Sequence, residues 1–132
     1  MTICVRQTSA SASEATIRGH RVAIDRPVEK GGTDQGPMGG ELFLAAIGGC
    51  FMSTLLAAIK AREAQVSDVH TEVIGTPEGT PPRFSSVELS VSAACEDAQL
   101  LQKLVEIADR GCIIVNTLRG TLPLNVRIVP RI

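Results

Sequence analysis

Residues 41–60 read ELFLAAIGGCFMSTLLAAIK, and this stretch decides the fold. From Leu42 to Ile59 it carries no charge, and Ala, Leu, Ile and Met favour a helix. Glu41 suits the positive end of a helix dipole. The stretch therefore predicts one long helix from about Glu41 to Ala64. Because this helix is apolar nearly all round, we expect a sheet and a further layer, such as a second subunit, to enclose it.

The same stretch barely reaches the length of a membrane span. It is rich in Ala, Gly, Ser and Thr, and charges follow directly at both ends, so its insertion energy is modest. We expect a buried helix and no membrane. Gly48 and Gly49 each cost a helix about 1 kcal/mol relative to Ala, which predicts that another backbone passes close to them.

Three short strands are expected before the helix, at Thr2–Gln7, Glu14–Arg18 and Arg21–Asp25. A tight turn at Arg18-Gly19-His20 joins the second to the third. Residues 26–40 then contain two Gly-Gly pairs, two prolines and no apolar periodicity. Loops of this length inside a small domain are usually functional.

After the helix, the pattern predicts strands at His70–Ile74 and Val87–Ala93, with a surface connection at Gly75–Arg83. A second helix begins near Asp97 and has one apolar stripe, with Gly111 expected as its left-handed C-cap. A last strand runs from about Leu122 to Ile128. The order β-β-β-α-β-β-α-(turn)-β predicts one α+β domain over residues 1–132.

Composition excludes several functions. The formal charge of −1 and the absence of long charge runs give no sign of a nucleic-acid surface. Three Phe, no Trp and no Tyr leave few stacking platforms. The N-terminus lacks the basic and apolar regions of an export signal. We therefore expect a cytoplasmic protein whose thiols stay reduced unless chemistry requires otherwise.

The four cysteines are the candidate reactive groups. No two have a C-x-x-C spacing and no His lies near them, so neither a structural zinc site nor another metal or organic cofactor is expected. Cys4 and Cys95 lie in predicted strands with apolar neighbours and are expected to be buried. Cys50 follows two glycines in mid-helix. Cys112 follows the Gly that ends one helix and can open the next short turn, and unpaired N–H groups at a helix N-terminus lower a thiol pKa.

Two motifs resemble the OsmC/Ohr family, which is named for osmotic induction and organic hydroperoxide resistance. Residues 41–50 are similar to the family's E-L-L-L-A-A-L-G-G-C segment, and Gly31–Pro37 resembles its G-G-x-x-x-G-P loop. Residues 107–112 with Asn116-Thr117-Leu118 are similar to A-x-x-C-P-V-x-x-T-L. The resemblance covers about residues 22–129.

The resemblance implies an OsmC-like α+β fold, with antiparallel sheets around two long central helices in an intertwined homodimer. It also implies a thiol peroxidase acting on organic hydroperoxides or hydrogen peroxide in oxidative stress defence. In that reaction Cys50 attacks the peroxide and becomes a sulfenic acid. Cys112 then closes a disulfide, which an external dithiol reduces.

The family pattern also includes an Arg and a Glu that stabilise the thiolate. The Glu stands ten residues before the first Cys, but Gly40 occupies that position here and Glu41 is one residue away. We take Arg26 as the first choice for the Arg, with Arg18 and Arg21 as alternatives. The family often has Pro after the second Cys, where this chain has Ile113, so the Cys112 turn is expected to be less firmly set.

Two other functions compete with the enzyme. One is a non-enzymatic dimeric module that binds a small apolar ligand near Ile113, Ile114 and Val115. The other is a thiol redox sensor that is oxidised without steady turnover. Catalysis by Cys50 and Cys112, with Arg26 and Glu41 in support, is the first hypothesis.

Overall fold

The computed structural model describes residues 1–131. Its contacts divide the chain into two compact units, Met1–Phe43 and Leu44–Ile132, each of which is described by itself. The expectation of one domain over residues 1–132 stays a prediction.

The first unit is a three-stranded antiparallel sheet in the order β1-β2-β3. β1 spans Cys4–Gln7, β2 spans Ser13–Ile17 and β3 spans His20–Ile24. The β2–β3 hairpin turns on two residues of positive φ, Arg18 at 49° and Gly19 at 85°. Such two-residue turns match the twist of the flanking strands, so the predicted tight turn is confirmed.

The loop after β3 is held in place by the buried carboxylate of Asp25, which is 3% exposed. The carboxylate accepts hydrogen bonds from the backbone N–H groups of Arg26, Thr33 and Gln35 and from the Thr33 hydroxyl at 2.6 Å. The loop contains one short helix, η1 at Val28–Lys30, and is otherwise irregular, as the sequence predicts. A Cβ on Gly32 would lie 1.9 Å from the carbonyl oxygen of Arg26, so only glycine fits there.

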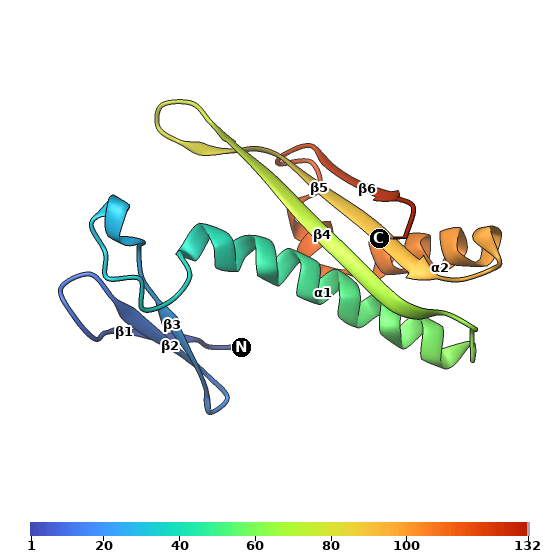
Figure 1. Cartoon of the computed structure of the whole chain (residues 1–132), viewed down its shortest axis with the longest axis horizontal. Helices are drawn as coiled ribbons and strands as arrows, with labels where there is room; N and C mark the ends of the chain where they lie inside the picture. Colours follow the sequence, from blue (N-terminus) through green and yellow to red (C-terminus); the bar gives the residue numbers. More distant parts are fainter. Residues whose placement is uncertain (132) are drawn as a thin grey trace. The chain divides into compact units, whose positions relative to one another are not determined.

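The second unit is built on a sheet in the order β4-β5-β6, shown in Figure 1. Helix α1 (Gly39–Ala61) leads into this unit and is followed by β4 (Ser67–Glu78) and β5 (Arg83–Ala94). Two helices, α2 (Ala98–Gly111) and α3 (Ile113–Leu118), then lead to β6 (Leu124–Ile128). The predicted α+β class and element order are confirmed.

β6 departs from the antiparallel pattern because it pairs with β5 in parallel, with Val87 opposite Leu124. A parallel neighbour needs a long crossover connection, and α2 with α3 supplies it.

The hairpin between β4 and β5 is longer than the sequence predicts. Gly75–Glu78 was expected in a surface connection but belongs to β4. Pro77 is tolerated because β4 is an edge strand. Gly75 is needed because a Cβ there would lie 2.8 Å from side-chain atoms of both Leu44 and Phe84.

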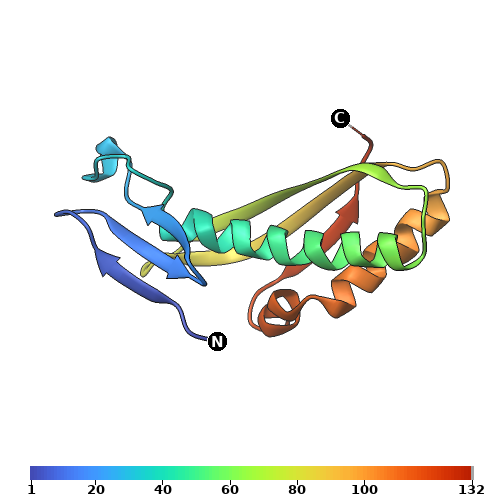
Figure 2. The same ribbon diagram turned by 90° about the horizontal axis from the view of Figure 1, so that it is seen from below.

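The core of this unit lies between the sheet and the two longer helices, which lie on the same side of the sheet in Figure 2. The buried face of α1 consists of Ile47, Phe51, Leu55 and Ala58. Facing residues come from β5 and α2: Val87, Leu89, Val91, Leu101, Leu104, Val105 and Ala108. Burial of a large aliphatic or aromatic side chain contributes about 1.5–3 kcal/mol.

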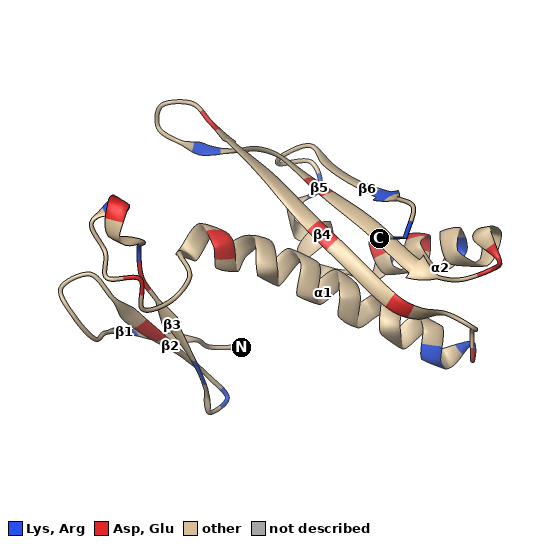
Figure 3. Cartoon of the chain, in the orientation of Figure 1, with Lys and Arg blue, Asp and Glu red and all other residues tan. Residues whose placement is uncertain are grey.

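The rest of α1 remains open. By length and composition alone, this helix could also span a membrane. Only 22% of its most apolar 18-residue window is buried among the described residues. Charged residues occur only near its two ends, as Figure 3 shows. One face therefore packs as the sequence predicts, while within the described part of the second unit no second layer covers the other face.

The glycine pair in α1 serves a different purpose from the one predicted. A Cβ on Gly48 would lie 2.7 Å from Cγ2 of Val73, so the close neighbour is a side chain of β4 and not a backbone. Gly49 has nothing within 4 Å of such a Cβ. Only Gly48 is explained by close packing in this chain.

Candidate thiol site

Cys50 and Cys112 come from two helical segments that pack together in the second unit. Cys50 lies in the middle of α1, and Cys112 is the single extended residue between α2 and α3, with φ −80° and ψ 116°. The Thr54 hydroxyl, one turn after Cys50, donates to the Cys50 carbonyl at 3.1 Å. A Cβ on Gly111 would lie 3.0 Å from Cγ2 of Thr54, so the end of α2 is pressed against α1.

This contact corrects the expected role of Gly111. The residue is the last of α2 and does not adopt the left-handed conformation, so the predicted C-cap is wrong. The glycine instead allows a close approach, because a side chain at this position would crowd Thr54 of α1. Asp97 caps the other end of α2 by accepting from the N–H of Leu100 at 3.0 Å.

The Cys112 thiol lies close enough to Cys50 to influence its pKa, and the reverse holds for Cys112. The backbone N–H groups of Ile113 and Ile114 also lie near the sulfur of Cys50. Those of Ile114 and Val115 lie near the sulfur of Cys112, although no side-chain hydrogen bond caps α3. The expectation that these cysteines lie together, sixty-two residues apart in sequence, is confirmed.

The surroundings shift the two thiols in opposite directions. Burial raises the pKa of Cys50, but the N–H of Ile114, the Cys112 thiol and the N–H of Ile113 together lower it below the ordinary value. Burial raises the pKa of Cys112, and the negative charge of Cys50 raises it further. Of the two thiols, Cys50 therefore loses its proton at the lower pH, while Cys112 holds its proton more tightly.

Access to the two sulfurs also differs. Cys112 is 0% exposed, whereas Cys50 is half-buried. Ile113, directly after Cys112, is 70% exposed and places an apolar side chain at the surface next to the pair. A reagent from solution reaches Cys50 first.

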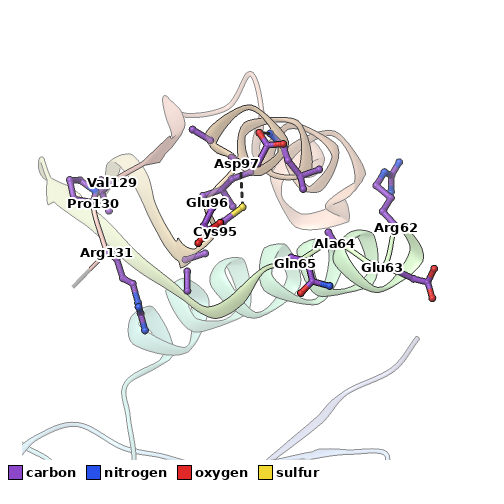
Figure 4. Close-up of a pocket in the computed structure, with 15 residues that line it drawn as sticks. Arg62, Glu63, Ala64, Gln65, Cys95, Glu96, Asp97, Val129, Pro130 and Arg131 are labelled. Carbon is purple, nitrogen blue, oxygen red and sulfur yellow. Dashed lines mark hydrogen bonds between the residues drawn. The ribbon is translucent and has the colours of Figure 1, made fainter.

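The other two cysteines are not the buried residues that the sequence predicts. Cys4 is exposed because it belongs to β1, an edge strand on which every residue is exposed. Cys95 is half-buried just beyond the end of β5, and its thiol donates to the carbonyl of Asp97 at 3.2 Å. Figure 4 shows it in a groove of about 1240 Å³ that contains neither Cys50 nor Cys112.

Arg26 and Glu41, the predicted supporting residues, both belong to the first unit. Arg26 follows the anchored Asp25 and is exposed. The Glu41 carboxylate accepts from the N–H of Met38 at 2.9 Å and so caps the start of α1. On one α-helix, the nine residues from Glu41 to Cys50 make about two and a half turns, which places the two side chains on opposite sides of α1.

The alternative arginines have other surroundings. Arg21 forms an ion pair with Glu14 at 2.9 Å, and Arg18 occupies the hairpin turn. Within residues 1–131, no group of three or more His, Cys, Asp or Glu side chains is arranged to hold a metal ion.

Sequence reasoning missed two features of this region. One is Asp25, whose only sequence signal is its position between a strand and a glycine-rich loop. The other is Asn116, whose side chain donates to the carbonyl of Arg110 at 2.9 Å across the Cys112 turn.

The α+β fold thus brings together Cys50 of α1 and Cys112 of the α2–α3 turn, with their pKa values shifted in opposite directions. The model of the family described as OsmC-like protein matches residues 32–127. The chain therefore belongs to the OsmC-like family, which confirms the resemblance read from its motifs.

Solved structures of similar fold cover nearly the whole chain. A putative osmotic stress induced and detoxification response protein from Psychrobacter arcticus 273-4 has a TM-score of 0.83 at 17% identity, covering 98% of this chain and 96% of that one. An OsmC-like protein from Mycoplasma pneumoniae has a TM-score of 0.83 at 18% identity, covering 98% and 95%.

A third similar structure is the organic hydroperoxide resistance protein OhrB of Bacillus subtilis. Its TM-score is 0.70 at 20% identity, covering 97% of this chain and 96% of that one. These likenesses show the fold. A search of curated proteins gave no significant match.

Proposed function

We propose that this protein is a cytoplasmic thiol peroxidase that reduces organic hydroperoxides or hydrogen peroxide through Cys50 and Cys112. The observation that carries the proposal is the neighbouring pair of cysteines, in which the half-buried Cys50 has the lowered pKa and the buried Cys112 the raised one. This is the asymmetry that a two-cysteine peroxidase needs, with one nucleophile ready for the oxidant and one thiol held in reserve.

The proposed reaction begins when the Cys50 thiolate attacks one peroxide oxygen. A sulfur–oxygen bond forms, the O–O bond breaks, and the leaving alkoxide takes a proton to become an alcohol, or water when the substrate is hydrogen peroxide. Cys50 is then a sulfenic acid.

The sulfur of Cys112 next attacks the sulfur of Cys50. The S–S bond forms, the S–O bond breaks, and the departing hydroxide leaves as water with the proton of the Cys112 thiol. An external dithiol then reduces the disulfide in two exchange steps and is itself oxidised to a disulfide.

Arg26 and Glu41 enter the proposal through the family resemblance, as groups that stabilise and orient the thiolate. The side chain of Arg26 has no ion pair or hydrogen bond within the described residues 1–131, so its charge is available for that role. Glu41 already caps α1, and Gly40 leaves the family's usual Glu position empty.

We also propose that the protein works as a homodimer. The face of α1 opposite the sheet exposes small and apolar residues, among them Ala46, Gly49, Ser53 and Leu56. A small-residue face of this kind allows two helices to approach closely, and no charge interrupts it. Covering it with a second copy would supply the missing layer over α1.

The test is steady-state reduction of cumene hydroperoxide with dithiothreitol as electron donor. We expect turnover by the native protein, background turnover after Cys50→Ser, and a first oxidation without sustained turnover after Cys112→Ser. Arg26→Ala and Glu41→Gln measure the contribution of the two supporting residues. Equal turnover by Cys50→Ser and the native protein would refute the proposal.

Two other functions remain as outcomes of the same experiment. Oxidation of the thiol pair without steady turnover would indicate a redox sensor. Peroxide-insensitive thiols, together with an apolar molecule that copurifies with the protein, would indicate a binding module, for which the exposed Ile113 provides an apolar contact.

A further inference from the structure

The turn that carries Cys112 is one residue long, and its geometry decides where two backbone N–H groups point. Cys112 is both the C-cap of α2 and the N-cap of α3, and it makes no side-chain capping hydrogen bond to α3. The first N–H groups of α3, those of Ile113 and Ile114, lie near the sulfur of Cys50 and lower the pKa of that thiol. Small changes in the angle between α2 and α3 would move both donors.

Two interactions tie the segments together across this turn. The side-chain amide of Asn116 donates to the carbonyl of Arg110 at 2.9 Å, which links α3 to the last turn of α2. Farther from the sulfurs, Arg119 forms an exposed ion pair with Asp109 at 2.6 Å. Exposed ion pairs contribute little, about 0–1 kcal/mol, so the Asn116 bond is the stronger candidate for setting the angle.

We propose that Asn116 is a positioning residue for the Cys50 thiolate: its amide fixes the Cys112 turn and thereby aims the N–H groups of Ile113 and Ile114 at the sulfur. The inference rests on the proposed function only in treating Cys50 as the reactive thiol. In this proposal Asn116 constrains the Cys112 turn, as a proline after the second cysteine would.

The residue at position 113 explains why such a device is needed. A proline there would fix φ near −65° and stiffen the turn, but it has no N–H group. Ile113 keeps its N–H near the sulfur of Cys50, and no ring fixes its φ. The chain therefore gains a donor to the thiolate and needs another constraint on the turn, which Asn116 provides.

The test compares Asn116→Leu with Thr117→Val. Leu has the branched shape of Asn, with a larger volume, and lacks the amide. Val removes the Thr117 hydroxyl, which donates to the carbonyl of Ile113 within α3 and does not cross the turn. The readout is the rate at which iodoacetamide alkylates Cys50 in the reduced protein as a function of pH, with the alkylated residue identified by peptide mapping. This reaction requires no peroxide.

We expect Asn116→Leu to move the alkylation profile of Cys50 to higher pH and to lower the rate at pH 7 about threefold to tenfold, the equivalent of one hydrogen bond. Thr117→Val should leave the profile unchanged. A lower melting temperature of Asn116→Leu together with an unchanged pH profile of Cys50 alkylation would overturn the proposal. Asn116 would then be a purely structural residue.

Asn116→Ser serves as a second variant in case Leu at this exposed position prevents folding. The Ser hydroxyl is too short to reach the carbonyl of Arg110, so the same shift is expected. If the profile shifts but the native protein shows no peroxide turnover, the proposed function fails while the role of Asn116 stands.

Discussion

Gly111 of α2 and Thr54 of α1 lie in close contact one turn away from Cys50, at a separation that a methyl group on Gly111 would crowd. A Cβ on Gly111 would lie 3.0 Å from Cγ2 of Thr54, and Thr54 is itself bonded through its hydroxyl to the carbonyl of Cys50. Cys112 follows Gly111 directly. The distance between the two sulfurs therefore depends on the side chain at position 111.

Gly111→Ala is expected to slow formation of the Cys50–Cys112 disulfide, because the added methyl pushes the end of α2 away from α1. Overpacking of this kind costs about 1–3 kcal/mol of stability. Thr54→Ser removes Cγ2, so the double variant should recover the native rate of closure. The rate is measured by quenching peroxide-treated protein at intervals and quantifying the linked peptides. Unchanged closure in the single variant would show that the contact does not control the pair.

The Cys112 thiol is expected to contribute to the low pKa of Cys50 by donating a hydrogen bond. Cys112→Ser retains a donor and Cys112→Ala removes it, so the pKa of Cys50 should be higher in the Ala variant than in the Ser variant. Titration of thiolate absorbance near 240 nm, read against a Cys50→Ser background, measures the difference. Identical titrations would mean that backbone N–H groups alone stabilise the thiolate.

Asp25 is expected to stabilise the loop of residues 26–37 in a pH-dependent way. Its hydrogen bonds with Thr33, the N–H groups of Arg26 and Gln35, and Ser11 hold its pKa well below the ordinary range. A lowered pKa in the folded state means that this stabilisation is fully present above about pH 4 and is lost as the pH falls further.

Asp25→Asn should therefore lower the melting temperature and speed proteolysis of the loop at pH 7. The difference from the native protein should shrink towards pH 3. Asp34→Asn makes the same chemical change in the same loop outside these hydrogen bonds, so it serves as the control. A difference that is constant from pH 7 to pH 3 would contradict the account.

The external reductant is expected to attack the disulfide at Cys50. Cys112 is 0% exposed, so a thiolate from solution meets the half-buried sulfur of Cys50 and releases Cys112 as the leaving group. Brief treatment of the oxidised protein with glutathione, acid quenching and peptide mapping should find glutathione on Cys50 and a free thiol at Cys112. Glutathione found mainly on Cys112 would show that the buried sulfur becomes accessible on oxidation.

The sequence was sufficient for those features that depend on local pattern. An uncharged apolar stretch located α1, an apolar stripe located α2, and Arg18-Gly19-His20 marked the β2–β3 hairpin. The motifs around Cys50 and Cys112 identified the family and the pair that the fold brings together.

Features that depend on neighbours distant in sequence were not predictable in this way. Gly111 looked like a helix cap because its contact with Thr54 lies 57 positions away. Gly75 looked like a turn residue because Leu44 and Phe84, which require it, come from other elements. The burial of Cys4 was misjudged because alternation in a strand does not reveal that the strand is an edge.

Thiol mapping after a single turnover tests most directly whether peroxide links Cys50 to Cys112. Fully reduced protein is treated with one equivalent of cumene hydroperoxide, alkylated, digested and analysed by mass spectrometry. The account predicts a Cys50–Cys112 linked peptide, with Cys4 and Cys95 still alkylated as free thiols. Four free thiols, or oxidation confined to Cys4 or Cys95, would contradict it.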